Sequence, residues 1–431
     1  MKRIALVFLT ISLLLGNLFA FAGFDDIFAS EDPVEETKKM NFSVSGSVGA
    51  TVGFYFNDQV FSEQLLRLNL LADSPSFKSE AALSFDAHQK ELKADTISIT
   101  SFFDWGFIKA GLLKEEWGSG DGVHVVDVLN AFDYSKGLSD DIFSMKRAEF
   151  MVTSTIYKDQ SSLQLYVKPT YTPGLASMKD KDDDRWSLLP KLPPPFSTFT
   201  FNDSPKTNAL EYAQFGLRGR TSFSGIDLGL IYYRGHMAQP GFEPDFGTST
   251  FNIVYTPYQL FGAEATYVLG QFTFMAEGGY MLSKDKAGTD PTLYNSKWVY
   301  LGGVSYLEPS SQLYVALMYN GHYIQNFDEV ENNSLSGLDV DMMQAFDGKA
   351  YGNTITLAME MPLFRERVNM RLGATYQIES EGFALLPSVS WQVSDDLKLE
   401  CKAVVYGGTK GGIFETWKDN DYMTIGITHF F

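Results

Sequence analysis

The sequence predicts an all-β protein whose strands form a closed, transmembrane antiparallel barrel. Three observations lead to this fold class: long runs of alternating apolar and polar residues, an aromatic content of 15%, and an alternating C-terminal segment that ends in Phe431. Alternation at period 2 is typical of a strand with one apolar and one polar face. In a membrane barrel the apolar face contacts lipid, aromatic residues lie at both interfaces, and the polar face lines the lumen.

The composition disfavours several other classes. Acidic residues outnumber basic ones and give a formal net charge of −19, which argues against a nucleic-acid partner, because neutralising phosphates requires clustered positive charge. The single cysteine, Cys401, rules out an intramolecular disulfide framework and a cysteine-built zinc site. Beyond the N-terminal segment, no run approaches the ~18 apolar residues of a membrane-spanning helix.

The N-terminus has the three parts of a secretory signal. A basic start precedes the apolar run "IALVFLTISLLLGNLFAFA", which ends in a small-x-small cleavage pattern. We therefore expect a cleaved signal peptide over 1–22, an acidic periplasmic segment over 23–40 and the barrel over 41–431.

The first strand shows the alternation most clearly. In "NFSVSGSVGATVGFYFN", which begins at Asn41, apolar side chains alternate with serine, threonine and glycine well beyond the mean strand length of about 5–6 residues. The same pattern recurs in "ALEYAQFGLRGRTSF", "GQFTFMAEGGYML", "SSQLYVALMYNGHY", "RVNMRLGATYQI" and "LKLECKAVV". A soluble sandwich also alternates, but its strands are shorter. A sheet in hydrocarbon must close, because an open edge would leave backbone amides unpaired.

Connection lengths predict the strand count. Barrels of this kind have short periplasmic turns, long external loops and both termini on the periplasmic side. This rule predicts about 18 strands, with about 16 as the alternative if the short early hairpins are misread. The predicted strands are 41–57, 62–72, 77–88, 91–102, 105–113, 142–156, 162–171, 210–222, 226–237, 251–267 (kept as one long strand), 271–283, 296–307, 311–325, 350–362, 367–379, 383–393, 397–408 and 420–431. The predicted long loops are 114–141, 172–209, 238–250, 284–295, 326–349 and 409–419.

The last strand, "DYMTIGITHFF", resembles the C-terminal signal of outer-membrane barrels. The resemblance implies that Phe431 is read by the barrel-assembly machinery, which is then an expected partner, together with outer-membrane lipid. On the same outward face, His429 is interpreted as an interfacial residue rather than a ligand.

The lumen-facing register contains the residues that would select solutes. Strand 210–222, for example, directs Tyr212, Gln214, Arg218 and Arg220 inward. Two interpretations stay open: solvated charges that merely keep the wall polar, or a basic ladder that favours anionic or zwitterionic solutes. The predicted pore-lining residues are Arg67, Lys109, Arg147, Arg218, Arg220, Glu264, Glu277, Arg367, Arg371, Lys398 and Glu400.

Two of the long loops are unusual. Within the loop 114–141, a Gly-rich turn is followed by an apolar stretch, which a freely solvated loop would not expose. We therefore expect this loop to fold into or against the barrel mouth and to narrow the pore. The aspartates of this loop could bind calcium, but their spacing is not that of an EF-hand. We therefore favour a role for them in stabilising turns. The loop 172–209 pairs an acidic run with prolines and is either a stiff lid or an irregular surface loop. The candidate constriction residues are Trp117, Asp121, Val125, Asp127, Asn130 and Asp133.

Two segments carry a resemblance to a family of uncharacterised porin-like outer-membrane barrels of diderm bacteria, some of them associated with efflux-type exporters. In "GLLKEEWGSGDGVHVVDVLNAFD" the matches are Trp117, Gly118, Asp127, Asn130 and Asp133, with Ala131 where the family often has proline. In "YTPYQLFGAEATYVLGQFTFMAEGGY" the matches are Gly262, Leu269-Gly270 and Glu277, with Ala276 in place of an arginine. The resemblance implies a barrel that moves hydrophobic or small solutes.

The sequence offers no catalytic constellation. Four of the histidines, His88, His124, His236 and His322, are scattered, and no Gly-x-Ser-x-Gly elbow occurs. We therefore expect neither an enzyme nor a cofactor or metal. The expected function is passive diffusion of small solutes through an outer-membrane pore, with anions favoured. The alternatives are a substrate-specific transporter of hydrophobic or amphipathic compounds and a surface-exposed adhesin or structural barrel; the oligomeric state is left open.

Overall fold

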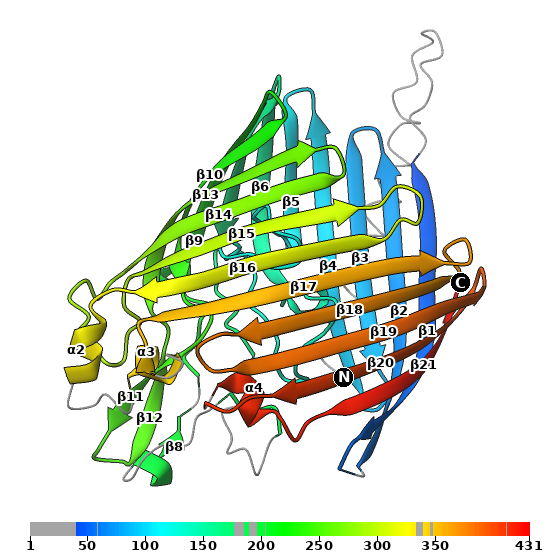
Figure 1. Ribbon diagram of the computed structural model, residues 1–431. Coiled ribbons are helices and arrows are strands. Elements are labelled where there is room, and N and C mark those ends of the chain that lie inside the picture. The colour runs from blue at the N-terminus through cyan, green and yellow to red at the C-terminus, as the bar shows by residue number, and fades with distance from the viewer. Residues whose placement is uncertain are drawn as a thin grey trace. The chain divides into compact units, whose positions relative to one another are not determined.

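In this computed structural model the chain forms a closed barrel of 18 antiparallel strands (Figure 1). The structure describes residues 40–431 except 58, 176–184, 189–195, 203, 333–338, 345–347 and 411. The expected signal peptide over 1–22 lies outside the described residues, and of the acidic segment over 23–40 only Met40 is described.

Each of the 18 predicted strands overlaps one strand of the barrel. The barrel strands are β1 (Asn41–Tyr55), β2 (Val60–Ser74), β3 (Phe77–Asp86), β4 (Glu91–Phe103), β5 (Gly106–Leu113), β6 (Glu149–Lys158), β7 (Ser161–Lys168), β9 (Gln214–Phe223), β10 (Ile226–His236), β13 (Pro257–Leu269), β14 (Phe272–Ser283), β15 (Lys297–Leu307), β16 (Tyr314–Ile324), β17 (Tyr351–Leu363), β18 (Val368–Gln377), β19 (Gly382–Ser394), β20 (Leu397–Gly407) and β21 (Tyr422–Phe430).

The sheet closes because β1 pairs with β2 on one side and with the last strand, β21, on the other. Gly49, for example, lies opposite Leu65 in β2 and opposite Thr428 in β21. All neighbouring pairs are antiparallel, so the strands satisfy one another's backbone N–H and C=O groups around the whole circumference. The prediction of a closed antiparallel barrel is confirmed.

The connections divide the barrel into two ends. The predicted short turns all lie at one end, where β1 begins and β21 ends, and the long loops lie at the other (Figure 1). Among the residues that the structure describes, the long-loop end also holds three short α-helices, α2 (Phe327–Asn332), α3 (Val340–Gln344) and α4 (Ile413–Thr416). Among the described residues, no helix is long and apolar enough to cross a membrane.

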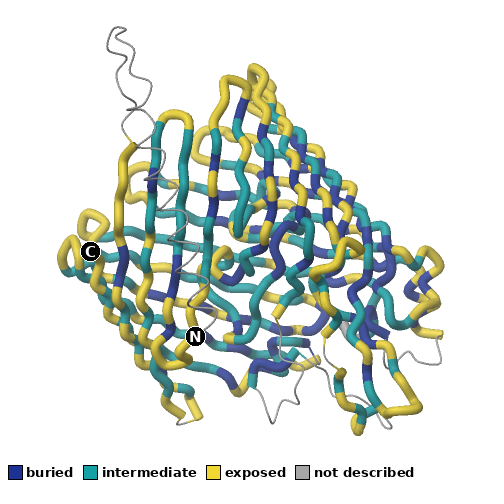
Figure 2. Tube along the Cα trace, turned by 180° about the vertical axis from the view of Figure 1, so that it is seen from behind, coloured by how far each residue is buried: buried dark blue, intermediate teal, exposed yellow. Residues whose placement is uncertain are grey.

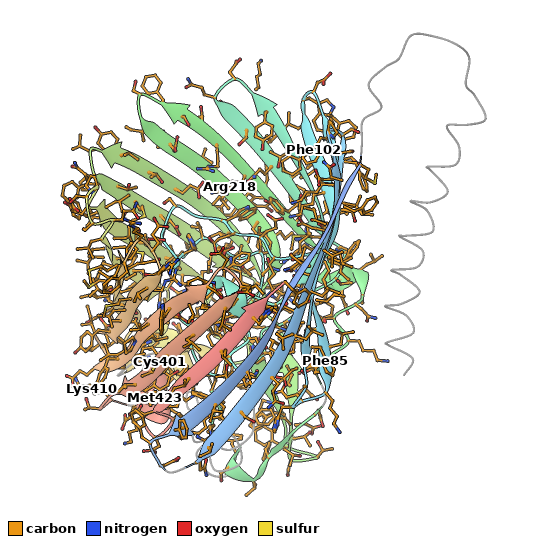
Figure 3. All side chains as sticks on the ribbon, turned by 90° about the vertical axis from the view of Figure 1, so that its right-hand side faces the viewer. Phe85, Phe102, Arg218, Cys401, Lys410 and Met423 are labelled. Atoms are coloured by element: carbon orange, nitrogen blue, oxygen red, sulfur yellow. The ribbon has the colours of Figure 1, made fainter. Side chains whose placement is uncertain are left out.

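The outer surface is apolar and bordered by aromatic residues. On β1 the predicted outward residues Val44, Val48 and Val52 are exposed, as a lipid-facing wall requires. Figure 3 labels Phe85, on the outward face of β3 near its end, and Phe102, near the end of β4, at different heights on the barrel. Exposed outward aromatic residues near the short turns include Phe103, Trp105, Phe223 and Phe272, and those near the long loops include Phe54, Phe85, Trp298, Tyr323, Tyr351 and Tyr376.

Two predicted strands start several residues too early. β6 begins at Glu149 rather than 142, and β9 begins at Gln214 rather than 210, because a 3-10 turn precedes each strand. Tyr212 therefore lies in a turn, not on the lumen face of a strand.

The predicted strand 251–267 is two strands. β12 (Thr250–Val254) pairs with β11 (Gly241–Asp245) and β8 (Thr200–Phe201) in a separate three-stranded sheet, and the barrel strand β13 starts at Pro257. Proline lacks an N–H donor and restricts the residue before it, so it suits the first position of a strand rather than its interior. The alternation continues across the break, which explains why the pattern alone did not reveal it.

The topology predicts opposite labelling of the two ends. In a Cys401→Ser background, Asp285→Cys places a thiol in the long loop after β14, and Asp395→Cys places one in the turn between β19 and β20. A membrane-impermeant maleimide added to intact cells should label the first and not the second. Labelling of both from the same side would contradict the strand count.

Candidate functional site

The loop between β5 and β6, residues 114–148, crosses the interior of the barrel; we refer to it as the lumen loop. Its side chains and backbone bond to strands on several sides of the wall: to Glu277 on β14, Tyr314 on β16, Tyr406 on β20 and Glu63 on β2. Figure 2 shows buried stretches on the chain that runs inside the barrel. The lumen loop therefore bridges walls that are far apart in the sheet.

An apolar cluster joins the lumen loop to the wall from β5 to β15. The loop contributes Trp117, Val126 and Leu129, all fully buried, and the wall contributes residues such as Tyr166 and Tyr233. The Trp117 ring packs edge-on against both tyrosines, with centroids 5.2 and 6.3 Å apart. Burying a large apolar side chain contributes about 1.5–3 kcal/mol, so this cluster accounts for the apolar stretch in the loop sequence.

Gly216 on β9 makes room for the Trp117 ring. A Cβ at this position would lie 2.6 Å from the ring. The wall is therefore shaped to receive this one side chain, and a larger residue at 216 would displace it.

The carboxylate of Glu277 holds the tip of the lumen loop. Its side chain is fully buried and accepts hydrogen bonds from backbone N–H groups on both limbs of the segment 118–126. Hydrogen bonds to an ionised acceptor are stronger than neutral ones, at about 1.5–3 kcal/mol net. The contacts are the N–H groups of Ser119, Gly120, Val125 and Val126, at 2.7, 2.7, 2.8 and 3.3 Å, and Nδ1 of His124 at 2.9 Å.

A second buried carboxylate, Glu264, lies directly opposite Glu277 on the neighbouring strand β13. Arg218 donates to both of its oxygens, at 2.6 and 2.9 Å, and also to the carbonyl of Gly118 at 3.3 Å. Arg220 lies 3.4 Å from the same carboxylate. A buried ion pair requires such additional hydrogen bonds to offset its desolvation, and here one of them ties the loop to the wall.

His124 lies between two carboxylates, with Glu277 at Nδ1 and Glu116 3.3 Å from Nε2. Burial alone would lower the pKa of His124, but the contacts with Glu116 and Glu277 outweigh it and raise this pKa to about 9. The hydrogen bond with His124 is also the main reason that the pKa of Glu116 falls to about 2. The imidazolium and both carboxylates are therefore charged together near neutral pH.

The base of the lumen loop is fastened by side chains that cross between its two ends. Asn130 accepts from the N–H of Glu115 and donates to the carbonyls of Leu113 and Arg147. Lys146 binds Asp127 at 2.5 Å and Glu116 at 3.0 Å. These contacts keep the start and the end of the loop together at the mouth of the β5–β6 hairpin.

The second half of the lumen loop reaches the opposite wall. Lys136 pairs with Glu63 at 2.6 Å and Asp140 pairs with Lys402 at 3.0 Å. The N–H of Leu138 donates to the hydroxyl of Tyr406, within a cluster that also contains Trp186 and Trp417. This half of the loop is thereby tied to β2 and β20.

The structure places the predicted constriction residues on the lumen loop in different roles. Val125 packs against the apolar cluster, and Asp121 accepts from the hydroxyl of Tyr314 across the lumen. Asp133 accepts from Ser135 two residues on, which is the turn role favoured by the sequence. Among the described residues, no group of three or more His, Cys, Asp or Glu side chains is arranged to hold a metal ion.

The predicted pore-lining residues divide into two groups. Arg218, Glu264 and Glu277 are buried beneath the lumen loop, so they do not face an open lumen. Arg147 lies in the loop itself and donates to the carbonyl of Pro173, and Arg367 lies in the turn between β17 and β18. The remaining residues, Arg67, Lys109, Arg220, Arg371, Lys398 and Glu400, lie on strands in the lumen-facing register.

Sequence reasoning missed several residues that complete the site. Lys168 on β7 pairs with Glu149 at 2.9 Å and donates to the carbonyl of Leu129 in the loop. Tyr314 and Tyr406 bond to the loop from the far walls. Their sequence context, a tyrosine in an alternating strand, does not distinguish them from the other tyrosines of the barrel. Gly216 offered one clue, because glycine at an inward strand position often marks a close approach.

Removing the Trp117 side chain should loosen the lumen loop without unfolding the barrel. Trp117→Ala deletes a fully buried ring and should cost about 3–5 kcal/mol of packing free energy, a typical value for such truncations. Amide hydrogen exchange of residues 118–126 should accelerate strongly. Trp105→Ala, which removes an exposed ring on the outer face, is the control and should leave this exchange unchanged.

The charge on His124 predicts a pH dependence. The pKa of His124 is raised from 6.5 to about 9 in the folded protein. The charged imidazole therefore stabilises the docked loop fully below pH 6.5, and this stabilisation is lost as the pH rises through about 9. Amide exchange of residues 118–126, corrected for its intrinsic pH dependence, should therefore speed up across this interval. In His124→Gln the interval should show no such change; an equal pH response in both proteins would contradict the assignment.

Comparisons with known proteins agree with this architecture. No family model and no curated protein matches the chain. Among solved structures, OpdO of Pseudomonas aeruginosa is 10% identical with a TM-score of 0.52, covering 92% of this chain and 97% of OpdO. A loop-deletion mutant of OmpT, an outer membrane protein of Vibrio cholerae, is also 10% identical, with a TM-score of 0.41, covering 91% of this chain and 99% of the mutant. The likeness to OpdO shows the fold alone, and that fold is a closed antiparallel β-barrel of 18 strands.

Proposed function

We propose that this chain is an outer-membrane channel through which small hydrophilic solutes diffuse passively. The observation that carries the proposal is the asymmetry of the interior. The lumen loop packs its apolar residues against the wall from β5 to β15, while inward-facing charged side chains on β2 and on β17–β20 stay partly exposed. A wall of hydrated, ionisable side chains is what a water-filled passage requires.

The exposed wall on β17–β20 carries charges of both signs. Arg371 pairs with Glu360 at 2.9 Å, and Lys402 pairs with Glu400 at 3.2 Å, with side chains between 30% and 48% exposed. Such half-exposed pairs remain accessible to water and to a passing solute. Because the charges largely compensate one another, this wall favours polar solutes without strongly selecting their sign.

We propose that the anion preference expected from the sequence is modest. It rests on two side chains that retain uncompensated charge. Arg67 has no carboxylate within 4.0 Å among the described residues, and Arg220 shares a carboxylate that Arg218 already neutralises. The Debye length is about 8 Å at 0.15 M salt, so two such charges on a wide wall attract anions only weakly.

Reversal potentials across planar bilayers test the charge preference. In a KCl gradient the refolded protein should show a small anion preference that disappears at high salt. The double variant Arg67→Gln/Arg220→Gln should lose it. A cation preference of the unmodified protein at low salt would contradict the proposal, and absence of current at any voltage would contradict the channel itself.

The lumen loop is proposed to narrow the passage. Deleting residues 119–125 removes the tip that binds Glu277 and leaves Trp117 and Asn130 to hold the base. Single-channel conductance should rise, while the folded barrel keeps its heat-modifiable migration in gels. An unchanged conductance would place the tip outside the permeation path.

A further inference from the structure

The tip of the lumen loop has the shape of an anion-binding cradle. Four backbone N–H groups and one imidazole nitrogen converge on a single carboxylate. All five belong to one short segment, 118–126, whereas the carboxylate comes from β14. The sequence separation between Ser119 and Glu277 is 158 residues. The segment therefore forms a complete set of donors, and only the anion is supplied from elsewhere.

The backbone of the segment is shaped around the carboxylate. Gly118 has a φ of +110°, and a Cβ there would lie 2.4 Å from Oε1 of Glu277. Backbone N–H groups that point into a common hollow carry partial positive charge and bind carboxylates and phosphates. His124 adds a full positive charge beside the same oxygen, at 2.9 Å.

We infer that the segment 118–126 is a carboxylate-binding site, which Glu277 occupies, and that its occupancy positions the lumen loop. When the Glu277 side chain is absent, a small free carboxylate such as formate binds in its place and restores the loop position. The inference deepens the proposed function, because it names the residue that sets the width of the passage. Glu277 is thus a positioning residue that acts through the loop.

A simpler alternative is that the Glu277 side chain only fills space under the loop. The variant Glu277→Gln distinguishes the two explanations. It keeps the size of the side chain but replaces one acceptor oxygen by an NH2 group that faces the N–H donors. A space-filling role tolerates this change. A carboxylate site does not, because each lost hydrogen bond to an ionised acceptor is worth about 1.5–3 kcal/mol, equivalent to tenfold or more in the population of the open loop.

The test measures the loop directly, so it does not depend on channel activity. Val126→Cys in a Cys401→Ser background places a thiol at a fully buried position of the segment 118–126, and its rate of maleimide labelling reports how often this segment leaves the wall. Glu277→Gln should raise this rate about tenfold or more. Glu379→Gln is the matched control: it removes a buried carboxylate that accepts from the backbone and side chain of Asn353 rather than from the tip, and should leave the rate unchanged.

Chemical rescue tests the site itself. In Glu277→Ala, potassium formate substituted for KCl at constant ionic strength should slow labelling towards the rate of the parent protein, and neutral formamide should not. Glu277→Ser provides a second cavity variant if the alanine protein does not fold. A parental labelling rate in Glu277→Gln, or rates in the cavity variants that ignore formate, would overturn the inference. If wild-type protein carries no current while formate still rescues labelling, the carboxylate site stands and the proposed channel fails.

Discussion

Two carboxylates buried side by side on neighbouring strands determine how the interior of this barrel is arranged. Glu264 and Glu277 are paired across β13 and β14, and both point into the barrel beneath the lumen loop. An ionised carboxylate is stable away from water only when charged or polar groups satisfy it. Arg218 satisfies the first, and the loop backbone with His124 satisfies the second. The loop therefore takes the place of water around a buried carboxylate of the wall.

The barrel could be predicted from the sequence because alternation at period 2 is a property of each strand by itself. Every outward valine of β1 is recognisable without knowledge of its neighbours. The strand boundaries near Glu149, Gln214 and Pro257 were less predictable, since the apolar pattern runs on through a turn or into a separate sheet. The alternation of apolar and polar residues does not indicate where one sheet ends and another begins.

The site was predicted in its parts and not in its assembly. The apolar stretch predicts a loop that folds into or against the barrel mouth, but the inward register of Glu277 and Arg218 predicts pore-lining residues rather than partners of that loop. Which inward residues meet water and which meet the loop depends on contacts between distant segments. The two sequence segments that share the family resemblance, one around Trp117 and one around Glu277, are the segments that meet here. Their chemistry became interpretable only once they were brought together.

The long sequence separation of the Ser119–Glu277 contact constrains the order of folding. Contacts between residues far apart along the chain form late, because a large loop must close first. The lumen loop leaves the wall after β5, yet the carboxylate that receives it lies on β14, six barrel strands further on. Until β14 is in the wall, the loop's donors lack this carboxylate and must bond to water. Docking of the loop therefore follows the incorporation of both β5 and β14, and an incomplete barrel that lacks either strand cannot hold the loop tip in place.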